Sequence, residues 1–165
     1  MSIYSIEGNI GSGKSTLVKM MKEQTTSDNV IFVQEPVDIW NIIKDKNNET
    51  ILEKYYKDQE KYAFSFQIMA YISRISILRK TIKKHPNAII ITERSVLTDR
   101  NVFAKMLYDD KKIEEVNHKI YLQWFDEFIE ELPVTGIIYV KAAVDVCFER
   151  INKRNRKGEL IPIEY

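Results

Sequence analysis

The sequence predicts an α/β fold in which a parallel sheet is flanked by helices. Short segments made almost entirely of Ile, Val, Phe and Tyr recur along the chain and alternate with longer segments of helical pattern. Strands that alternate with helices imply βαβ units, and wholly apolar strands are typical of a sheet that is buried on both faces. A glycine-rich loop follows the first of these strands. The expected strands are residues 2–6, 30–34, 88–92 and 136–141.

The helices are placed by periodicity and by breakers. The helix 14–24 (KSTLVKMMKEQ) follows the glycine-rich loop, and a long helix covers 59–84 until His85-Pro86-Asn87 ends it. The other expected helices are short ones near 37–57, two near 96–108 and 113–131, and one over 142–153.

Length and composition narrow the class of protein. A chain of 165 residues is expected to form one domain, and its 44% hydrophobic content is enough for a core. A net charge of +1 argues against a partner that is a nucleic acid polymer or a membrane surface. Cys147 is the single cysteine, so an internal disulfide is excluded. With no apolar run near the roughly 18 residues of a membrane helix and no leader pattern, we expect a cytoplasmic protein.

The glycine-rich loop is the most informative motif. Residues 8–15 (GNIGSGKS) match Gly-x4-Gly-Lys-Ser, the phosphate-binding P-loop, between an expected strand and an expected helix. Glycines let successive N–H groups point at a phosphate, and the helix N-terminus adds further donors. The lysine reaches the β- and γ-phosphates and the serine hydroxyl ligates Mg2+. The predicted ATP-binding residues here are Gly8, Asn9, Ile10, Gly11, Ser12, Gly13, Lys14, Ser15 and Thr16.

Charged residues follow the other expected strands. In an open parallel sheet, ligands bind outside the carboxyl ends of the strands. Cations and Mg2+ stabilise the charge that spreads over a transferring phosphoryl group, and a carboxylate can take the proton of an acceptor hydroxyl. The charged residues that follow the expected strands therefore predict phosphoryl transfer. They are Glu35 after the second strand, Glu93 and Arg94 after the third, and Arg150, Arg154 and Arg156 after the fourth strand and its helix.

The long helix shows two faces. An isoleucine stripe with 3–4 spacing is expected to face the core; it comprises Ile68, Ile72, Ile75 and Ile82. A second face, flanked by Tyr62 and Phe66, resembles a pocket that reads an aromatic ring by its edge. A solvated polar face is the alternative, which periodicity alone favours. The residues of this face are Gln67, Ala70, Tyr71 and Arg74.

Five segments together resemble one family, the deoxynucleoside kinases related to deoxycytidine and deoxyguanosine kinase. They are IEGNIGSGKST (6–16), EPVDIW (35–40), YKDQEKYAFSFQ (56–67), ERSVLTDRNVFA (93–104) and IPIEY (161–165). The resemblance implies a three-layer P-loop kinase fold with about five parallel strands and an arginine-rich lid. It also implies transfer of the γ-phosphoryl of ATP, with Mg2+, to the 5′-hydroxyl of a deoxynucleoside in nucleotide salvage, and assembly as a homodimer.

The resemblance assigns catalytic roles to single residues. Glu35 is similar to the family's general base, and Arg94 to the arginine that holds this base and the 5′-oxygen. Glu93 would help to hold Mg2+ beside Ser15, with strand-end salt bridging as the alternative. Arg150, Arg154 and Arg156 resemble the lid over the ATP phosphates, since the planar fork of arginine suits phosphate; a solvated basic helix end is the alternative.

The resemblance also assigns the nucleoside site. Gln67 would make paired bonds to the base, because its amide both donates and accepts, and Trp40 and Phe103 would wall the base. Tyr56 and Glu159 match a pair that grips the sugar 3′-hydroxyl, although the segment around Glu159 is one residue shorter than the family pattern. Phe66 and Ala70 complete the predicted nucleoside-binding set.

Arg74 and Asp99 carry the prediction of base preference. Family members that take deoxycytidine or purine deoxynucleosides have an Arg and an Asp at these places, whereas those that take thymidine have apolar residues that leave room for the methyl group. A buried Arg–Asp pair is costly unless it is fully hydrogen-bonded. We therefore expect deoxycytidine, deoxyadenosine or deoxyguanosine as the acceptor, without a choice among them.

The sequence departs from the family at its end, because family members continue past the position of Tyr165 with a helix and a last strand.

Two alternatives to a deoxynucleoside kinase stay open. A nucleoside monophosphate kinase of thymidylate type shares the P-loop, but usually has an arginine where this chain has Gln34 and glycines where it has Val37-Asp38. A non-catalytic P-loop protein would bind ATP without turnover.

Overall fold

The computed structural model describes residues 1–156, 159 and 161–163 and divides the chain into two compact units. The sheet unit comprises Met1–Glu35, Lys80–Ser95 and Pro133–Tyr165, and the helical unit comprises Pro36–Arg79 and Val96–Leu132. Each unit is described by itself. That residues 1–165 form one kinase domain without the family's last helix and strand stays a prediction.

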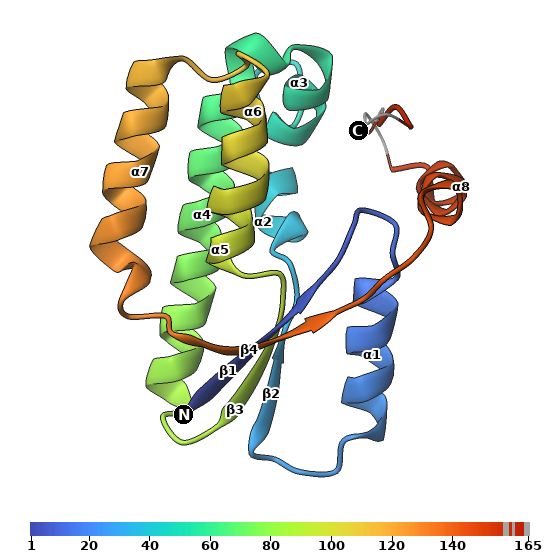
Figure 1. Ribbon diagram of the computed structural model, residues 1–165, viewed down its shortest axis with the longest axis vertical. Helices are drawn as coiled ribbons and strands as arrows, with labels where there is room; N and C mark the ends of the chain where they lie inside the picture. Colours follow the sequence, from blue (N-terminus) through green and yellow to red (C-terminus); the bar gives the residue numbers. More distant parts are fainter. Residues whose placement is uncertain (157–158, 160, 164–165) are drawn as a thin grey trace. The chain divides into compact units, whose positions relative to one another are not determined.

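The sheet unit is built on parallel strands, as the sequence predicts. The strands are β1 (Ser2–Glu7), β2 (Val30–Val33), β3 (Ile89–Glu93) and β4 (Val134–Tyr139), in the order β2-β3-β1-β4 (Figure 1). The central strand β1 pairs its Ile6 with Glu93 on one side and with Ile138 on the other. The fold class is confirmed, but the expected strand number of about five is corrected to four among the described residues. The fifth strand was expected only from the resemblance, beyond Tyr165.

Among the described residues, two helices lie wholly within the sheet unit. Helix α1 (Lys14–Gln24) packs on the sheet through a cluster of buried apolar residues that includes Ile6, Val18 and Ile91. Helix α8 (Val144–Arg154) buries Cys147. Strand β4 begins two residues earlier than expected. The hydroxyl of Thr135 accepts the N–H of Ile3 at 3.0 Å, which extends the pairing toward the start of β1.

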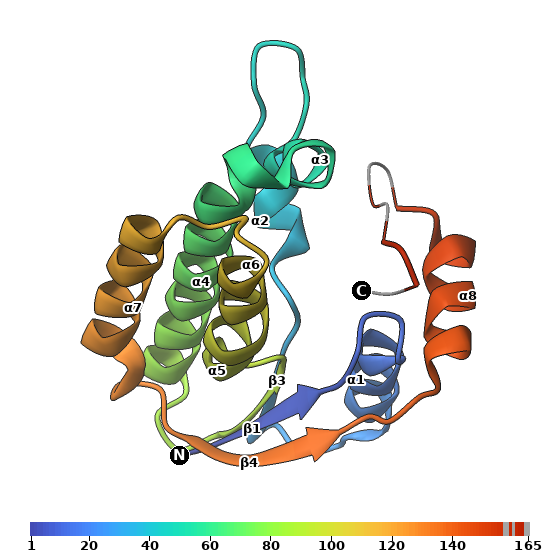
Figure 2. The same cartoon turned by 45° about the horizontal axis from the view of Figure 1, so that its top comes forward.

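The helical unit contains seven helical segments among the described residues. Figure 2 shows α4, α6 and α7 side by side. Helix α3 begins at a capping box, in which Thr50 and Glu53 exchange side-chain to backbone hydrogen bonds of 2.8 and 3.1 Å. The segments are α2 (Val37–Ile42), α3 (Ile51–Lys57), α4 (Gln59–Lys84), α5 (Val96–Thr98), the π-helix η1 (Asp99–Ala104), α6 (Lys105–Asp109) and α7 (Glu115–Ile129). Helix α4 continues into the sheet unit from Lys80.

The buried face of α4 differs from the expected isoleucine stripe. Ile75 is buried, but Ile72 is 50% exposed, so the stripe as predicted is wrong at that position. The polar face is buried instead: Gln67 is 3% exposed and Arg74 2%. The cause is that α7 and η1 cover this face. The hydroxyl of Tyr71 lies 3.0 and 3.1 Å from two backbone carbonyls of α7. The alternative of a solvated polar face is therefore excluded.

No helix within the described part of the chain combines the length and the apolar character that crossing a bilayer requires.

Candidate active site

The P-loop connects β1 to α1 and requires glycine at two positions. Gly8 and Gly11 have φ angles of 145° and 78°, and Gly13 caps α1 in the left-handed region at 104°. A Cβ at Gly8 would lie 2.4 Å from the carbonyl oxygen of Val140, and one at Gly11 would lie 2.4 Å from that of Cys147. The loop therefore approaches neighbouring backbone too closely for any side chain at either position.

The remaining loop residues fix its shape. The side chain of Asn9 accepts the N–H of Ile10 at 2.9 Å, and its carbonyl accepts the N–H of Ser12 at 3.2 Å. The Ser12 hydroxyl is buried and meets no hydrogen-bond partner among the described residues. Thr16 is exposed in the first turn of α1. The open N-terminus of α1 faces this loop, as an anion site requires.

Lys14 is folded back into the loop. Its side chain is buried and its ammonium donates to the carbonyls of Gly8 at 3.1 Å and Asn9 at 2.7 Å. Burial, with a smaller contribution from the positive charge of Arg94, lowers the pKa of Lys14 to about 8. Nearby carboxylates oppose this lowering; they belong to Glu35, Glu93 and Glu7. The cation is held where a phosphate group would enter the loop.

The lowered pKa of Lys14 predicts a pH dependence of ATP binding. In the protein without nucleotide, Lys14 is charged below about pH 8 and neutral above it, so binding a polyphosphate above that pH requires proton uptake. We expect the Kd for ATP–Mg2+ to rise by up to about tenfold per pH unit above this pKa. Calorimetric titrations from about pH 7 to pH 9.5 would measure it. A Lys14→Arg variant, whose guanidinium stays charged, should show a flatter dependence of the Kd on pH. An equally flat dependence in the unmodified protein would contradict the lowered pKa of Lys14.

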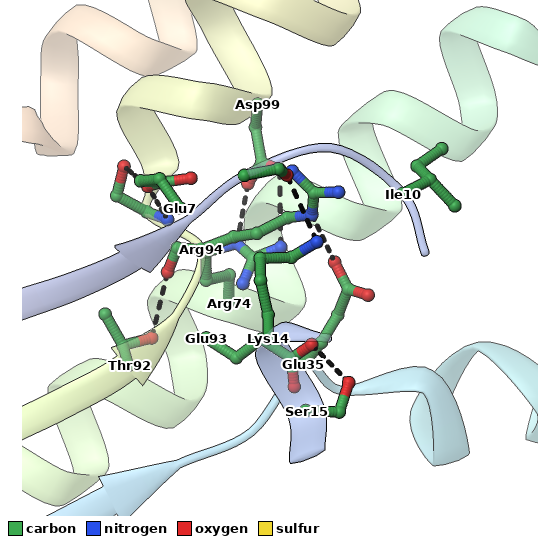
Figure 3. A network of polar contacts seen from close by, with 12 residues as sticks. Glu7, Ile10, Lys14, Ser15, Glu35, Arg74, Thr92, Glu93, Arg94 and Asp99 are labelled. Carbon is green, nitrogen blue, oxygen red and sulfur yellow. Dashed lines mark hydrogen bonds and ion pairs between the residues drawn. The ribbon is translucent and has the colours of Figure 1, made fainter. Parts of the chain in front are cut away.

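Ser15 and Glu93 provide two oxygen ligands close together. The Ser15 hydroxyl donates to Glu93 Oε1 at 2.5 Å, and Glu93 is buried at the end of β3 (Figure 3). Mg2+ accepts one or two protein oxygens and completes its shell with water and substrate phosphates. The described residues contain no cluster of three or more His, Cys, Asp or Glu side chains that could hold a metal. The Ser15–Glu93 pair therefore fits Mg2+ that arrives with a nucleotide.

Glu35 and Arg94 form an ion pair in the sheet unit. Arg94 Nε lies 3.6 Å from Glu35 Oε1 (Figure 3). Glu35 follows β2 and Arg94 follows β3, so the pair lies at the carboxyl edge of two neighbouring strands. Arg94 is buried and has a φ of 62°, a left-handed conformation that is uncommon for an arginine. This ion pair orients the carboxylate that the sequence predicts as the base.

The three predicted lid arginines do not all contact the same partner. Arg150 Nη1 donates to the carbonyl of Ser12 at 3.0 Å, so it lies against the P-loop. Arg154 Nη2 lies 2.6 Å from Glu159 Oε2, and Arg156 Nη1 lies 3.8 Å from Glu159 Oε1. Glu159 is thus paired with two arginines, and its predicted contact with a sugar hydroxyl stays a prediction.

The helical unit holds the residues predicted to read the base. Arg74 Nε donates to Asp99 Oδ2 at 2.8 Å, and both side chains are almost fully buried. Asp99 is the first residue of η1, a type of helix that is often found at functional sites. Gln67, about two turns earlier on α4, has a buried Oε1 for which the described part of the chain offers no hydrogen-bond partner. An unsatisfied buried amide oxygen is suited to a polar ligand.

Of the two predicted aromatic walls, Trp40 is packed in the core of the helical unit. Trp40 meets Phe66 edge to face at 5.4 Å, and its indole N–H donates to Ser73 at 3.0 Å. Ala70 belongs to the same buried cluster, and Tyr56 packs against it. Phe103 is partly buried on η1.

Ser73 and Glu7, which contact a predicted site residue or the residue next to one, were not predicted from the sequence. The Ser73 hydroxyl accepts the indole N–H of Trp40, and Glu7 accepts the N–H of Ser95, the residue after Arg94. The signal for Glu7 was present, because it is a carboxylate at the end of an apolar strand and directly before the glycine-rich loop.

The fold and the sheet-unit site define a class. A glycine-rich loop between a central parallel strand and a helix, with a buried lysine and a Ser–Glu pair, is the arrangement of P-loop phosphotransferases. A sequence model of the family described as "Deoxynucleoside kinase" matches residues 4–165. The chain therefore belongs to the deoxynucleoside kinase family, a family of phosphotransferase enzymes that phosphorylate deoxynucleosides in nucleotide salvage.

Three relatives illustrate the similarity. Human deoxycytidine kinase is 36% identical over 98% of this chain and 69% of its own length. A protein of Fowlpox virus named probable deoxycytidine kinase is 36% identical over 98% of this chain and 65% of its own length. Mitochondrial deoxyguanosine kinase of Xenopus laevis is 32% identical over 94% of this chain and 64% of its own length. The chain thus spans about two thirds of the length of these relatives.

Proposed function

We propose that this protein transfers the γ-phosphoryl group of ATP to the 5′-hydroxyl of a deoxynucleoside, and that deoxycytidine or a purine deoxynucleoside is preferred over thymidine. The observation that carries the preference is the buried ion pair between Arg74 and Asp99. The names of the human and Xenopus relatives, a deoxycytidine and a deoxyguanosine kinase, agree with it.

The proposed reaction uses the sheet unit for phosphate and proton. Glu35 accepts the proton of the 5′-hydroxyl as the oxygen forms its bond to the γ-phosphorus and the bond to the departing ADP breaks. Arg94 orients Glu35, and Lys14 with Arg150, Arg154 and Arg156 stabilises the negative charge on the phosphoryl oxygens. Ser15 and Glu93 would hold Mg2+, which would supply positive charge against the negative charge that develops on the phosphoryl group.

The proposed recognition of the base uses the helical unit. A buried charged pair contributes little to stability unless its remaining donors and acceptors are bonded. Arg74 has five N–H donors and Gln67 can both donate and accept, so the set matches the polar edge of cytosine or a purine. Trp40, Phe66 and Phe103 would contact the faces of the base, Ala70 leaves space beside it, and Tyr56 and Glu159 would bind the 3′-hydroxyl.

We further propose a cytoplasmic homodimer that does not bind nucleic acid polymers or membranes. Large apolar side chains that are half exposed on α4 and α7 support a protein contact; they are Ile72 (50%), Ile120 (40%) and Trp124 (50%).

The test compares a nucleoside with its monophosphate as acceptor. We expect ATP–Mg2+ and deoxycytidine to give dCMP, identified by mass, and dCMP not to be converted to dCDP. Conversion of dCMP or dTMP in place of the nucleoside would identify the monophosphate kinase alternative, which Gln34 disfavours because it stands where those enzymes usually have an arginine. ATP binding without any product would identify the non-catalytic alternative.

A further inference from the structure

We propose that Glu7 is a positioning residue for phosphoryl transfer, whose carboxylate holds the backbone turn that carries Arg94. The inference rests on the proposed function only because that function has Arg94 orient Glu35 during phosphoryl transfer. Glu7 is the last residue of β1, and Arg94 follows the neighbouring strand β3.

One oxygen of Glu7 receives three hydrogen bonds. Glu7 Oε1 accepts the backbone N–H of Ser95 at 2.9 Å and its hydroxyl at 2.7 Å. It also accepts the hydroxyl of Ser5 at 2.5 Å. All three residues are buried. Two of the three bonds therefore connect β1 to the residue that directly follows Arg94, and the third stays within β1.

Arg94 needs such a connection, because its left-handed φ of 62° persists only where the surroundings determine it. Its N–H donates to the carbonyl of Ile6 at 3.0 Å, and its carbonyl accepts the hydroxyl of Thr92 at 3.0 Å. Together with the Glu7–Ser95 bonds, these contacts tie the backbone on both sides of Arg94 to the sheet. The ion pair of Arg94 with Glu35 depends on this turn for its direction.

The second carboxylate oxygen distinguishes Glu7 from a purely structural anchor. Glu7 Oε2 is buried and finds no hydrogen-bond partner in the residues that the structure describes. A buried carboxylate oxygen without such a bond is costly, so a neutral anchor would hold the fold better. Glu7 acts on Arg94 through Ser95, whose backbone N–H and hydroxyl both donate to Glu7 Oε1.

The experiment uses the two serines as a matched pair. Ser95→Ala and Ser5→Ala each remove one hydroxyl from the same oxygen of Glu7, but only Ser95 adjoins Arg94. We expect Ser95→Ala and Glu7→Ala to lower kcat by about ten- to a hundredfold, because small misplacement of a reacting group has effects of that size. Ser5→Ala should keep kcat within about twofold. Glu7→Gln, which retains an accepting oxygen, should lower kcat less than Glu7→Ala does. The KM for ATP should change less than kcat in Ser95→Ala.

Amide hydrogen exchange of residues 93–96 provides a readout that does not need turnover. Exchange there should be faster in Glu7→Ala and unchanged in Ser5→Ala. Equal loss of kcat in the two serine variants, or unchanged exchange in Glu7→Ala, would overturn the inference. Absence of turnover in the unmodified protein would instead count against the proposed function, while the exchange rates would still decide whether Glu7 holds the turn. If Glu7→Ala does not fold, Ser95→Ala and Glu7→Gln decide the outcome.

Discussion

Glu35→Gln is expected to lower kcat by about two to four orders of magnitude, the range for losing a positioned general base. The amide keeps the size and shape of the side chain but cannot take the proton of a 5′-hydroxyl. The ion pair with Arg94, 3.6 Å long in the structure, becomes a weaker contact. Binding of ATP–Mg2+ at neutral pH should change much less than kcat, because Glu35 influences the P-loop only through its charge, which raises the pKa of Lys14.

Rapid-quench measurement of the chemical step, with nucleotide affinity measured separately, would test this prediction. Asp38→Asn is a suitable control, since it neutralises an exposed carboxylate three residues away. We expect that control to retain full activity. Near-normal turnover in Glu35→Gln would show that another group accepts the proton.

The double variant Arg74→Met/Asp99→Ala is expected to shift the acceptor preference toward thymidine by about ten- to a hundredfold in relative kcat/KM. The size corresponds to gaining or losing one well-made contact in a substrate pocket. Asp99→Ala alone leaves the guanidinium of Arg74, which is 2% exposed, without its partner carboxylate. That single change should therefore destabilise the protein by about 3–5 kcal/mol, and the second change should recover part of this free energy of unfolding.

The measurement is kcat/KM for deoxycytidine and for thymidine in the unmodified protein, both single variants and the double variant, with denaturant unfolding of each. The exposed pair of Arg79 and Glu131 is the matched control, because its side chains are 53% and 45% exposed. Removing that pair should cost at most about 1 kcal/mol and leave the base ratio unchanged. An unchanged base ratio in the Arg74/Asp99 double variant would refute the specificity argument.

Local sequence signals were sufficient for much of the fold. The bounds of α1 and α4 agree with those expected, because a glycine loop begins the first and His85-Pro86-Asn87 follows the second. The parallel sheet follows from four apolar strands that alternate with helices. The P-loop conformation follows from glycines whose φ angles other residues rarely adopt.

Non-local contacts decided what the sequence did not show. Ile72 was expected in the core, yet packing of α7 and η1 turned the opposite face of α4 inward. The π-helical turn η1 lies within a segment expected as a regular helix. The bonds of Glu7 to Ser95 join residues 88 positions apart.

The most direct test of the proposed reaction is the rate of monophosphate formation from ATP–Mg2+ and each of the four deoxynucleosides. We expect the highest kcat/KM on deoxycytidine, deoxyadenosine or deoxyguanosine, with thymidine the poorest acceptor. Highest activity on thymidine would contradict the role of Arg74 and Asp99. Absence of product from all four, with ATP still bound, would contradict the proposed reaction itself.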